Sequence, residues 1–111
     1  MITVIKSPFV QYKLTILRNK KTSNTVFRQT MNEISYLIAS DVLQYVPFKK
    51  QTIETPLKKM SGTALGQPII LVPILRAGLG LLEGFAKFLP EAEKGHIGLY
   101  RDEQTYEPVE Y

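Results

Sequence analysis

The centre of the predicted fold is residues 68–85, which read Pro-Ile-Ile-Leu-Val-Pro-Ile-Leu-Arg-Ala-Gly-Leu-Gly-Leu-Leu-Glu-Gly-Phe. The unalternating apolar run from Ile69 to Val72 is typical of a strand that is covered on both faces, as in a parallel sheet. After Arg76 and the glycines that follow it, apolar residues return at helical spacing, from Leu79 to Leu89. These residues therefore predict a strand, a short loop and a helix in that order.

The loop at Arg76 has the composition of an anion site. Loops at the carboxyl ends of parallel strands are where open α/β sheets bind ligands. Gly78 lets the backbone approach a ligand closely, and N–H groups at the start of the next helix favour an anion. Arg76 adds a forked, permanent positive charge that suits phosphate oxygens. We therefore predict a phosphate or diphosphate site; the alternative is an ordinary turn in which Arg76 pairs with a nearby carboxylate.

Two commoner phosphate motifs are excluded. The dinucleotide fingerprint needs glycine at its first, third and sixth positions, but the sixth position counted from Gly78 is Glu83. The sequence contains no Gly-Lys-Ser or Gly-Lys-Thr, so it has no Walker-type loop. The predicted ligand is neither a dinucleotide nor a nucleotide held by a P-loop.

A second arginine is predicted at the same edge of the sheet. Residues Gly95–Tyr100 read as a parallel strand, which completes a right-handed β-α-β unit. Arg101 follows this strand as Arg76 follows the first, and neighbouring strands lie about 4.8 Å apart. Two arginines so placed could hold one diphosphate from two sides. The alternative for Arg101 is an ion pair with Asp102 or Glu103 in a surface turn.

The rest of the chain predicts two helices, a short strand, a loop and a last strand. Ser7 and Pro8 are typical of a helix start, and Pro47 ends the second helix. The predicted elements are a helix at residues 8–18, a helix that begins near Ser23 to Thr25 and runs to Tyr45, a short strand at Thr52–Thr55, a loop at Ser61–Gln67 and a strand at Thr105–Tyr111. The last strand has no predicted partner, so the sequence is expected to be the front part of a larger α/β domain, or to gain its missing cover by oligomerisation.

Composition indicates one globular domain. A chain of 111 residues could bury roughly two-thirds of its unfolded surface. It has no cysteine, no apolar run of about 18 residues and no signal peptide, so a cytoplasmic protein without membrane contact is expected. The net charge of +4 combines +7 in residues 1–60 with −3 in residues 61–111. The lysines of the basic half occur as scattered pairs, and nucleic acid is not an expected partner.

Several strings of this sequence resemble uracil phosphoribosyltransferase, and together they extend over nearly the whole chain. The most specific is Val72-Pro-Ile-Leu-Arg-Ala-Gly-Leu-Gly80, and another is Gly95-His-Ile-Gly-Leu-Tyr-Arg-Asp-Glu103. The resemblance continues at Ser7-Pro-Phe-Val-Gln-Tyr-Lys-Leu-Thr15, Thr22-Ser23, Phe27-Arg28, Glu54-Thr-Pro56, Thr105, Glu107-Pro-Val109 and Tyr111. It implies an α/β fold: a partial Rossmann-like parallel sheet of the type I phosphoribosyltransferase class, with N-terminal helices. Residues 1–111 would be the N-terminal part of one such domain, left incomplete.

The resemblance also implies an activity. Such enzymes transfer phosphoribose from 5-phosphoribosyl 1-diphosphate (PRPP) to N1 of uracil with Mg²⁺, giving UMP and diphosphate. Arg76 and Arg101 match the family's diphosphate-contacting arginines, with Ala77 and Gly78 as the supporting loop. A non-proline cis peptide is expected near Arg76. No catalytic residue and no metal ligand is assigned, because the family's 5-phosphate loop and uracil-reading segment come later in its sequence.

Three further expectations follow from the resemblance. GTP is a possible activator, because it activates some members of the family. The strand at residues 105–111 is expected to pair subunits of a homo-oligomer. The 111-residue chain alone is expected to be inactive. The alternative function is a nucleotide-sensing, RNA-binding regulator of the same fold.

Overall fold

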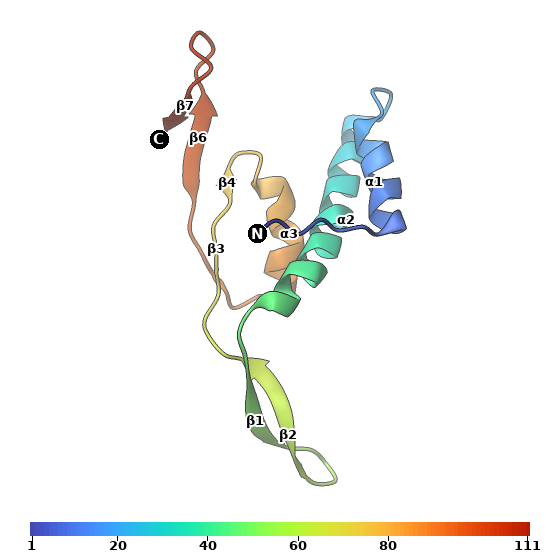
Figure 1. The fold of residues 1–111 in the computed structure, drawn as a ribbon, viewed down its shortest axis with the longest axis vertical. Helices are drawn as coiled ribbons and strands as arrows, with labels where there is room; N and C mark the ends of the chain where they lie inside the picture. Colours follow the sequence, from blue (N-terminus) through green and yellow to red (C-terminus); the bar gives the residue numbers. More distant parts are fainter.

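Three α-helices and seven short strands follow one another along the chain, and the computed structural model describes all 111 residues (Figure 1). The helical elements are α1 (Pro8–Arg18), α2 (Asn24–Val42), the 3-10 turn η1 (Leu43–Tyr45) and α3 (Leu79–Phe88). The strands are β1 (Phe48–Glu54), β2 (Lys59–Leu65), β3 (Ile70–Leu71), β4 (Ile74–Leu75), β5 (Glu93–Lys94), β6 (Ile97–Arg101) and β7 (Pro108–Glu110). No helix has the length and apolarity needed to cross a membrane.

The two N-terminal helices begin where the sequence predicts, and each has a serine cap. The hydroxyl of Ser7 accepts a hydrogen bond from the Val10 N–H at 3.5 Å, and Pro8 occupies the first turn of α1. The hydroxyl of Ser23 accepts from the Val26 N–H at 3.2 Å at the start of α2. Helix α2 ends at Val42 and tightens into η1, so the predicted helix to residue 45 is confirmed with a 3-10 last turn.

The central β-α-β unit is confirmed. Strand β3 pairs parallel with β5 and β4 pairs parallel with β6, and α3 connects the two strands of each pair in the chain. The first strand was predicted from Ile69 to Val72. In the structure it extends to Leu75 but is split at Pro73, which has no N–H to donate. Hydrogen bonds from Gly95 N–H to Leu71 O (3.0 Å) and from Ile97 N–H to Pro73 O (3.1 Å) span the break. The chain therefore runs through 70–75 as one interrupted strand.

The prediction of a loop at Ser61–Gln67 is wrong, because most of this segment is β2. It pairs antiparallel with β1 over seven residue pairs, from Phe48 with Leu65 to Glu54 with Lys59. The turn between the strands is closed by the side chain of Thr55, which donates to Lys58 O at 2.7 Å and accepts from Lys58 N–H at 3.0 Å. Gly62 suggested a loop, but it lies within β2 opposite Gln51, so this glycine does not interrupt the pairing.

The prediction that the last strand lacks a partner is also wrong. Strand β7 pairs antiparallel with β6, with Tyr100 opposite Val109 and Arg101 opposite Pro108. A tight turn between them makes this pairing possible. One carboxylate oxygen of Asp102 accepts from the N–H groups of Gln104 (2.8 Å) and Thr105 (2.9 Å). Such a side chain imitates a backbone turn, which brings the chain straight back along β6.

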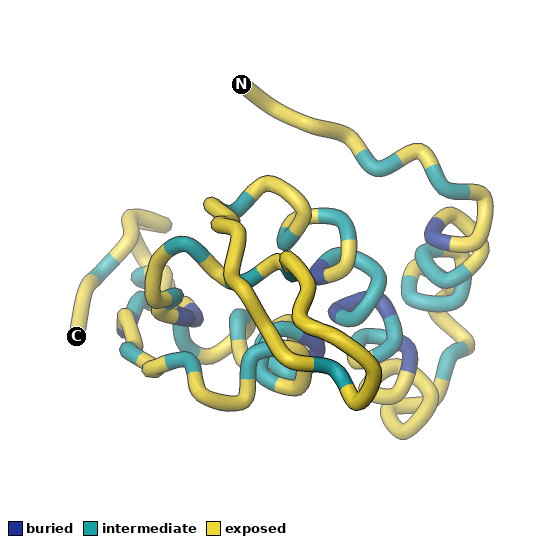
Figure 2. The backbone as a smooth tube through the Cα atoms, turned by 90° about the horizontal axis from the view of Figure 1, so that it is seen from below, coloured by how far each residue is buried: buried dark blue, intermediate teal, exposed yellow.

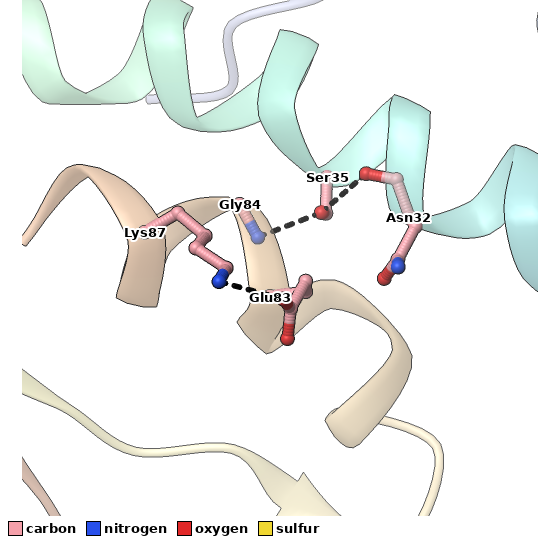
Figure 3. A network of polar contacts seen from close by, with 5 residues as sticks. All are labelled: Asn32, Ser35, Glu83, Gly84 and Lys87. Carbon is pink, nitrogen blue, oxygen red and sulfur yellow. Dashed lines mark hydrogen bonds and ion pairs between the residues drawn. The ribbon is translucent and has the colours of Figure 1, made fainter. Parts of the chain in front are cut away.

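Helix α3 is fixed against α2 by one close contact (Figure 3). A Cβ atom at Gly84 would lie 2.4 Å from the carbonyl carbon of Ser35, so only glycine fits there. The Ser35 hydroxyl accepts from the Gly84 N–H at 2.8 Å and donates to Asn32 O at 2.6 Å. Because α3 follows directly after the Arg76 loop, this contact also sets where that loop lies.

The molecule is extended and buries little. Its radius of gyration is 18.2 Å, whereas a compact domain of this length would have about 13 Å. Nine of the 111 residues are buried, most of them between α2, α3 and the parallel strands (Figure 2). The β1–β2 hairpin projects away from this core, and every residue of β1 is exposed. The expectation that the chain buries about two-thirds of its surface is therefore wrong for these 111 residues alone.

Candidate functional site

The loop between β4 and α3 is held tightly by its own backbone. The Gly78 N–H donates to Ile74 O at 2.8 Å, and a Cβ atom at Gly78 would lie 2.6 Å from Ile74 N. This position therefore needs glycine for close backbone approach. The peptide bond between Leu75 and Arg76 is cis, which confirms the expectation for this loop.

The unpaired backbone donors lie earlier in this loop than the sequence predicts. The N–H groups that open α3 are paired within the chain, since Leu79 donates to Arg76 O (3.1 Å) and Gly80 donates to Ala77 O (3.2 Å). In contrast, the N–H groups of Arg76 and Ala77 donate to no atom of the chain. Two adjacent unpaired N–H groups beside a guanidinium can bind an anion. The free N–H groups that the sequence predicts at the helix start are therefore found at Arg76 and Ala77 instead.

Both predicted arginines lie at the carboxyl ends of neighbouring parallel strands. Leu75 of β4 pairs with Gly98 of β6, so Arg76 comes one residue after this pair. Arg101 comes three residues after Gly98 and is the last residue of β6 rather than the first residue beyond it. We call Arg76, Ala77 and Arg101 the arginine rim. The structure brings the two arginines to one edge of the sheet, while their role in binding an anion stays a prediction.

Neither arginine is neutralised by a carboxylate. Both side chains are exposed, and the ion pairs of the chain within 4.0 Å are Lys13 with Glu33, Lys59 with Glu54 and Lys87 with Glu83. The alternatives in which Arg76 or Arg101 pairs with a nearby acid are therefore wrong. Two cations without acidic partners at one edge of a sheet attract an anion more strongly than two paired ones would.

Asp102, the acid next to Arg101 in the chain, is hydrogen-bonded to backbone N–H groups of the turn and does not pair with Arg101. Backbone hydrogen bonds from Thr105 and then Gln104 hold the pKa of the Asp102 carboxyl below its usual value. The carboxylate is thus ionised but directed into the turn, away from a role as counter-ion. This function of Asp102 was not predicted from the sequence. The spacing of Asp102 and Thr105, three residues apart with the N–H groups of a turn between them, is the signal that could have indicated it.

The donor set does not fit a magnesium cage. The chain has no group of three or more His, Cys, Asp or Glu side chains that could hold a metal ion, although the family implies Mg²⁺. Mg²⁺ is usually bound by one or two carboxylates together with substrate phosphates. What these 111 residues offer to a ligand at the arginine rim is therefore cations and N–H groups.

A hollow lies at the opposite end of the parallel strands from the arginine rim. It has a volume of about 630 Å³ and is found at the amino-terminal ends of β3 and β5, beside the base of the hairpin. Its lining includes Leu65, Ile70, Phe88 and Pro90, with Lys49 and Glu93 at its margin. We do not assign the anion site to this hollow, because its lining is mainly apolar and carries no pair of unopposed cations.

Comparison with known proteins identifies the family. The family model described as uracil phosphoribosyltransferase matches residues 4–111. The chain belongs to this family. The uracil phosphoribosyltransferase of Levilactobacillus brevis is 48% identical over 109 residues, which are 97% of this chain and 52% of the relative. That of Lactiplantibacillus plantarum is 49% identical over 109 residues, with the same coverage.

A solved structure shares the fold. The AQ2163 protein from Aquifex aeolicus superposes with a TM-score of 0.89 at 30% sequence identity, over 100% of this chain and 54% of that chain. This confirms the expected α/β class and the partial phosphoribosyltransferase fold. The chain spans about half the length of the relatives that it matches.

Proposed function

We propose that this chain carries the diphosphate-binding part of a uracil phosphoribosyltransferase. In the proposed reaction, the bond between C1 of the ribose and the diphosphate oxygen breaks, and a bond from uracil N1 to C1 forms. The bonding electron pair leaves with the diphosphate, and uracil N1 loses its proton. The observation that supports this role is the arginine rim: two exposed guanidinium groups without acidic partners, next to the unpaired N–H groups of Arg76 and Ala77.

The chemistry of the leaving group explains why cations are needed there. Negative charge builds up on the diphosphate as the C1–O bond breaks, so fixed positive groups that meet this charge stabilise the transition state. The two arginines come from adjacent strands, and their backbone positions are set before substrate binds. Groups that are already in place need no reorganisation during the reaction.

The same proposal predicts that the 111 residues bind diphosphate but do not form UMP. In the family, the loop that binds the 5-phosphate has a Thr-Gly-Gly-Ser-type sequence, and no such string occurs here. A cytoplasmic location, a GTP activator and Mg²⁺ delivered with PRPP remain expectations from the family. A homo-oligomer through residues 105–111 is also proposed, and the outer edge of β7 is unpaired in the sheet order β4-β6-β7.

Nuclear magnetic resonance of the ¹⁵N-labelled chain, titrated with inorganic diphosphate, tests the proposal directly. The amide signals of Arg76 and Ala77 are expected to shift most, because their N–H groups are unpaired. The amides of Leu79 and Gly80, which donate within the loop, provide internal controls. Equal shifts throughout the chain, or none at Arg76 and Ala77, would refute the proposed site.

A further inference from the structure

The turn between β6 and β7 is organised around one half-buried residue, Asp102. Its main-chain N–H donates to Glu107 O at 2.9 Å, and its carbonyl oxygen accepts from the Tyr106 N–H at 2.8 Å. One oxygen of its carboxylate accepts from the N–H groups of Gln104 at 2.8 Å and Thr105 at 2.9 Å. This residue therefore holds the two sides of the turn together.

The turn needs this support, because part of its backbone has an unfavourable conformation. Tyr106 has a φ of 61°, in the left-handed region, where the side chain of any residue but glycine crowds the backbone. Such a conformation persists only where surrounding contacts enforce it. The Tyr106 N–H donates to Asp102 O, and the Thr105 N–H beside it donates to the Asp102 carboxylate. The hydrogen bonds of Asp102 are thus among the contacts that keep the turn in this shape.

On the side of β7, the place of Arg101 depends on the same turn. Arg101 is the last residue of β6 and lies opposite Pro108. The next pair of the ladder is hydrogen-bonded, because the Asp102 N–H donates to Glu107 O. Hydrogen-bonded pairs alternate with pairs that are not in an antiparallel ladder, and Pro108 has no N–H to donate. The pair that fixes the end of β6 against β7 is therefore the one formed by Asp102.

On the other side, β4 does not extend as far as Arg101. Strand β4 ends at Leu75, which pairs with Gly98, three residues before Arg101. The chain then leaves the sheet to form the loop before α3. The end of β6 thus projects past its parallel neighbour, and the turn at Asp102 is what holds it in place.

We propose that Asp102 is a positioning residue of the arginine rim: its carboxylate holds the β6–β7 turn and thereby keeps Arg101 at the rim. This inference rests on the proposed diphosphate site and adds to it a residue that acts through Arg101. The lowered pKa of Asp102 agrees with this role, because N–H groups favour the ionised carboxylate, which is then the form present at neutral pH.

The charge of Asp102 acts on an anion in the opposite direction from its hydrogen bonds. A carboxylate beside the rim repels diphosphate, so the removal of this charge alone should strengthen binding. Asp102→Asn removes the charge but keeps a side-chain oxygen that can accept from the same N–H groups. Asp102→Ala removes the charge and the acceptor together. The two variants therefore separate positioning from charge.

Isothermal titration calorimetry of the 111-residue chain with inorganic diphosphate is the first test. Asp102→Ala should weaken binding by about 5- to 10-fold, because Arg101 must then be ordered when the anion binds. Asp102→Asn should bind at least as tightly as the parent. Thr55→Ala is the matched control, since Thr55 closes the β1–β2 turn at the other end of the molecule (Figure 1), and it should leave the affinity unchanged. Unchanged or tighter binding by Asp102→Ala would overturn the proposal.

Nuclear magnetic resonance relaxation of the ¹⁵N-labelled chain without ligand is the second test, and it does not depend on the proposed function. The heteronuclear Overhauser effect of the Arg101 amide should fall in Asp102→Ala and keep the parent value in Asp102→Asn and Thr55→Ala. A parent chain that shows this pattern but binds no diphosphate would refute the proposed function and leave the positioning of Arg101 intact. An Arg101 amide that is as rigid in Asp102→Ala as in the parent would refute the positioning role, whatever the affinity for diphosphate.

Discussion

The contact between α2 and α3 differs from the arginine rim in how its polar groups are paired. At the contact, Gly84 and Ser35 approach so closely that no added carbon fits, and the Ser35 hydroxyl is satisfied as both donor and acceptor. At the rim, two cations and two N–H groups have no partners in the chain. Polar groups are thus paired with one another where the two helices pack, and they are unpaired where a ligand is proposed to bind.

This difference separates the consequences of mutation. A change at the helix contact should reduce stability, and through α3 it should also displace the rim. A change at the rim should reduce anion binding and leave stability unchanged. The following experiments test that separation.

The largest effect is expected for Gly84→Ala. The new methyl group would lie 2.4 Å from a Ser35 backbone atom, so the helices must move apart. We expect the free energy of unfolding to fall by about 3 kcal/mol, the upper part of the usual cost of overpacking. Thermal unfolding followed by circular dichroism measures this. Gly62→Ala is the control, since its nearest contact would be an ordinary 3.5 Å; equal losses for both variants would contradict the close contact.

The next effect concerns binding and should leave stability unchanged. Arg76→Ala and Arg101→Ala should each weaken diphosphate binding by about 10- to 100-fold, through loss of charged hydrogen bonds. The free energy of unfolding should change by less than about 0.5 kcal/mol, because both side chains are exposed. Isothermal titration calorimetry measures the affinity. Arg18→Ala, at the end of α1, is the matched control; normal affinity in both rim variants would show that the rim is not an anion site.

A smaller loss of stability is expected for Ser35→Ala. The variant removes the hydroxyl that accepts from the buried Gly84 N–H without adding volume, and the loss of one such hydrogen bond costs about 1 kcal/mol. Chemical denaturation gives the value. Ser61→Ala, at an exposed position of β2, should have little effect. If Ser35→Ala were as stable as the parent chain, the hydroxyl would not contribute to holding α3.

The smallest effect is expected for the ion pair of Lys13 and Glu33, which joins α1 to α2. The hydrogen bond from Lys13 holds the pKa of Glu33 below its ordinary value of 4.5. A carboxyl whose pKa is lowered by folding stabilises the protein above its unfolded pKa, and this contribution is lost as the pH falls through the folded pKa. Melting temperatures of the parent and Glu33→Gln should therefore differ slightly at pH 7 and converge below about pH 4. A constant difference at all pH values would contradict the pairing.

The sequence predicted those parts of the fold that depend on local signals. Ser7 and Pro8 marked the start of the first helix, and Pro47 marked the end of the second. The apolar run followed by Arg76 indicated the β-α-β unit and the common edge of its two arginines. The short strand predicted at Thr52–Thr55 lies mostly within β1. The second strand of the hairpin was missed because Gly62 and Gly66 are typical of loops, whereas its pairing depends on a partner strand that local composition does not show. The partner of β7 was missed for a related reason: the turn that returns it to β6 is made by one side chain, Asp102.

Part of the candidate site could not be predicted from the sequence. Helix starts are expected to carry unpaired N–H groups, but here the 3-10 type bonds of Leu79 and Gly80 use the loop carbonyls. The unpaired donors are consequently those of Arg76 and Ala77. Only the path of the backbone decides which N–H groups remain available.

The small number of buried residues has a calorimetric consequence. The heat capacity change of unfolding and the dependence on denaturant both scale with the area that unfolding newly exposes. The folded chain exposes 9210 Å², and its unfolded form would expose about 18,000 Å², so unfolding exposes about a quarter less new area than it would in a compact domain of the same mass. Its denaturant slope should therefore be shallower than that of such a domain, and any segment that packs on the chain should steepen that slope.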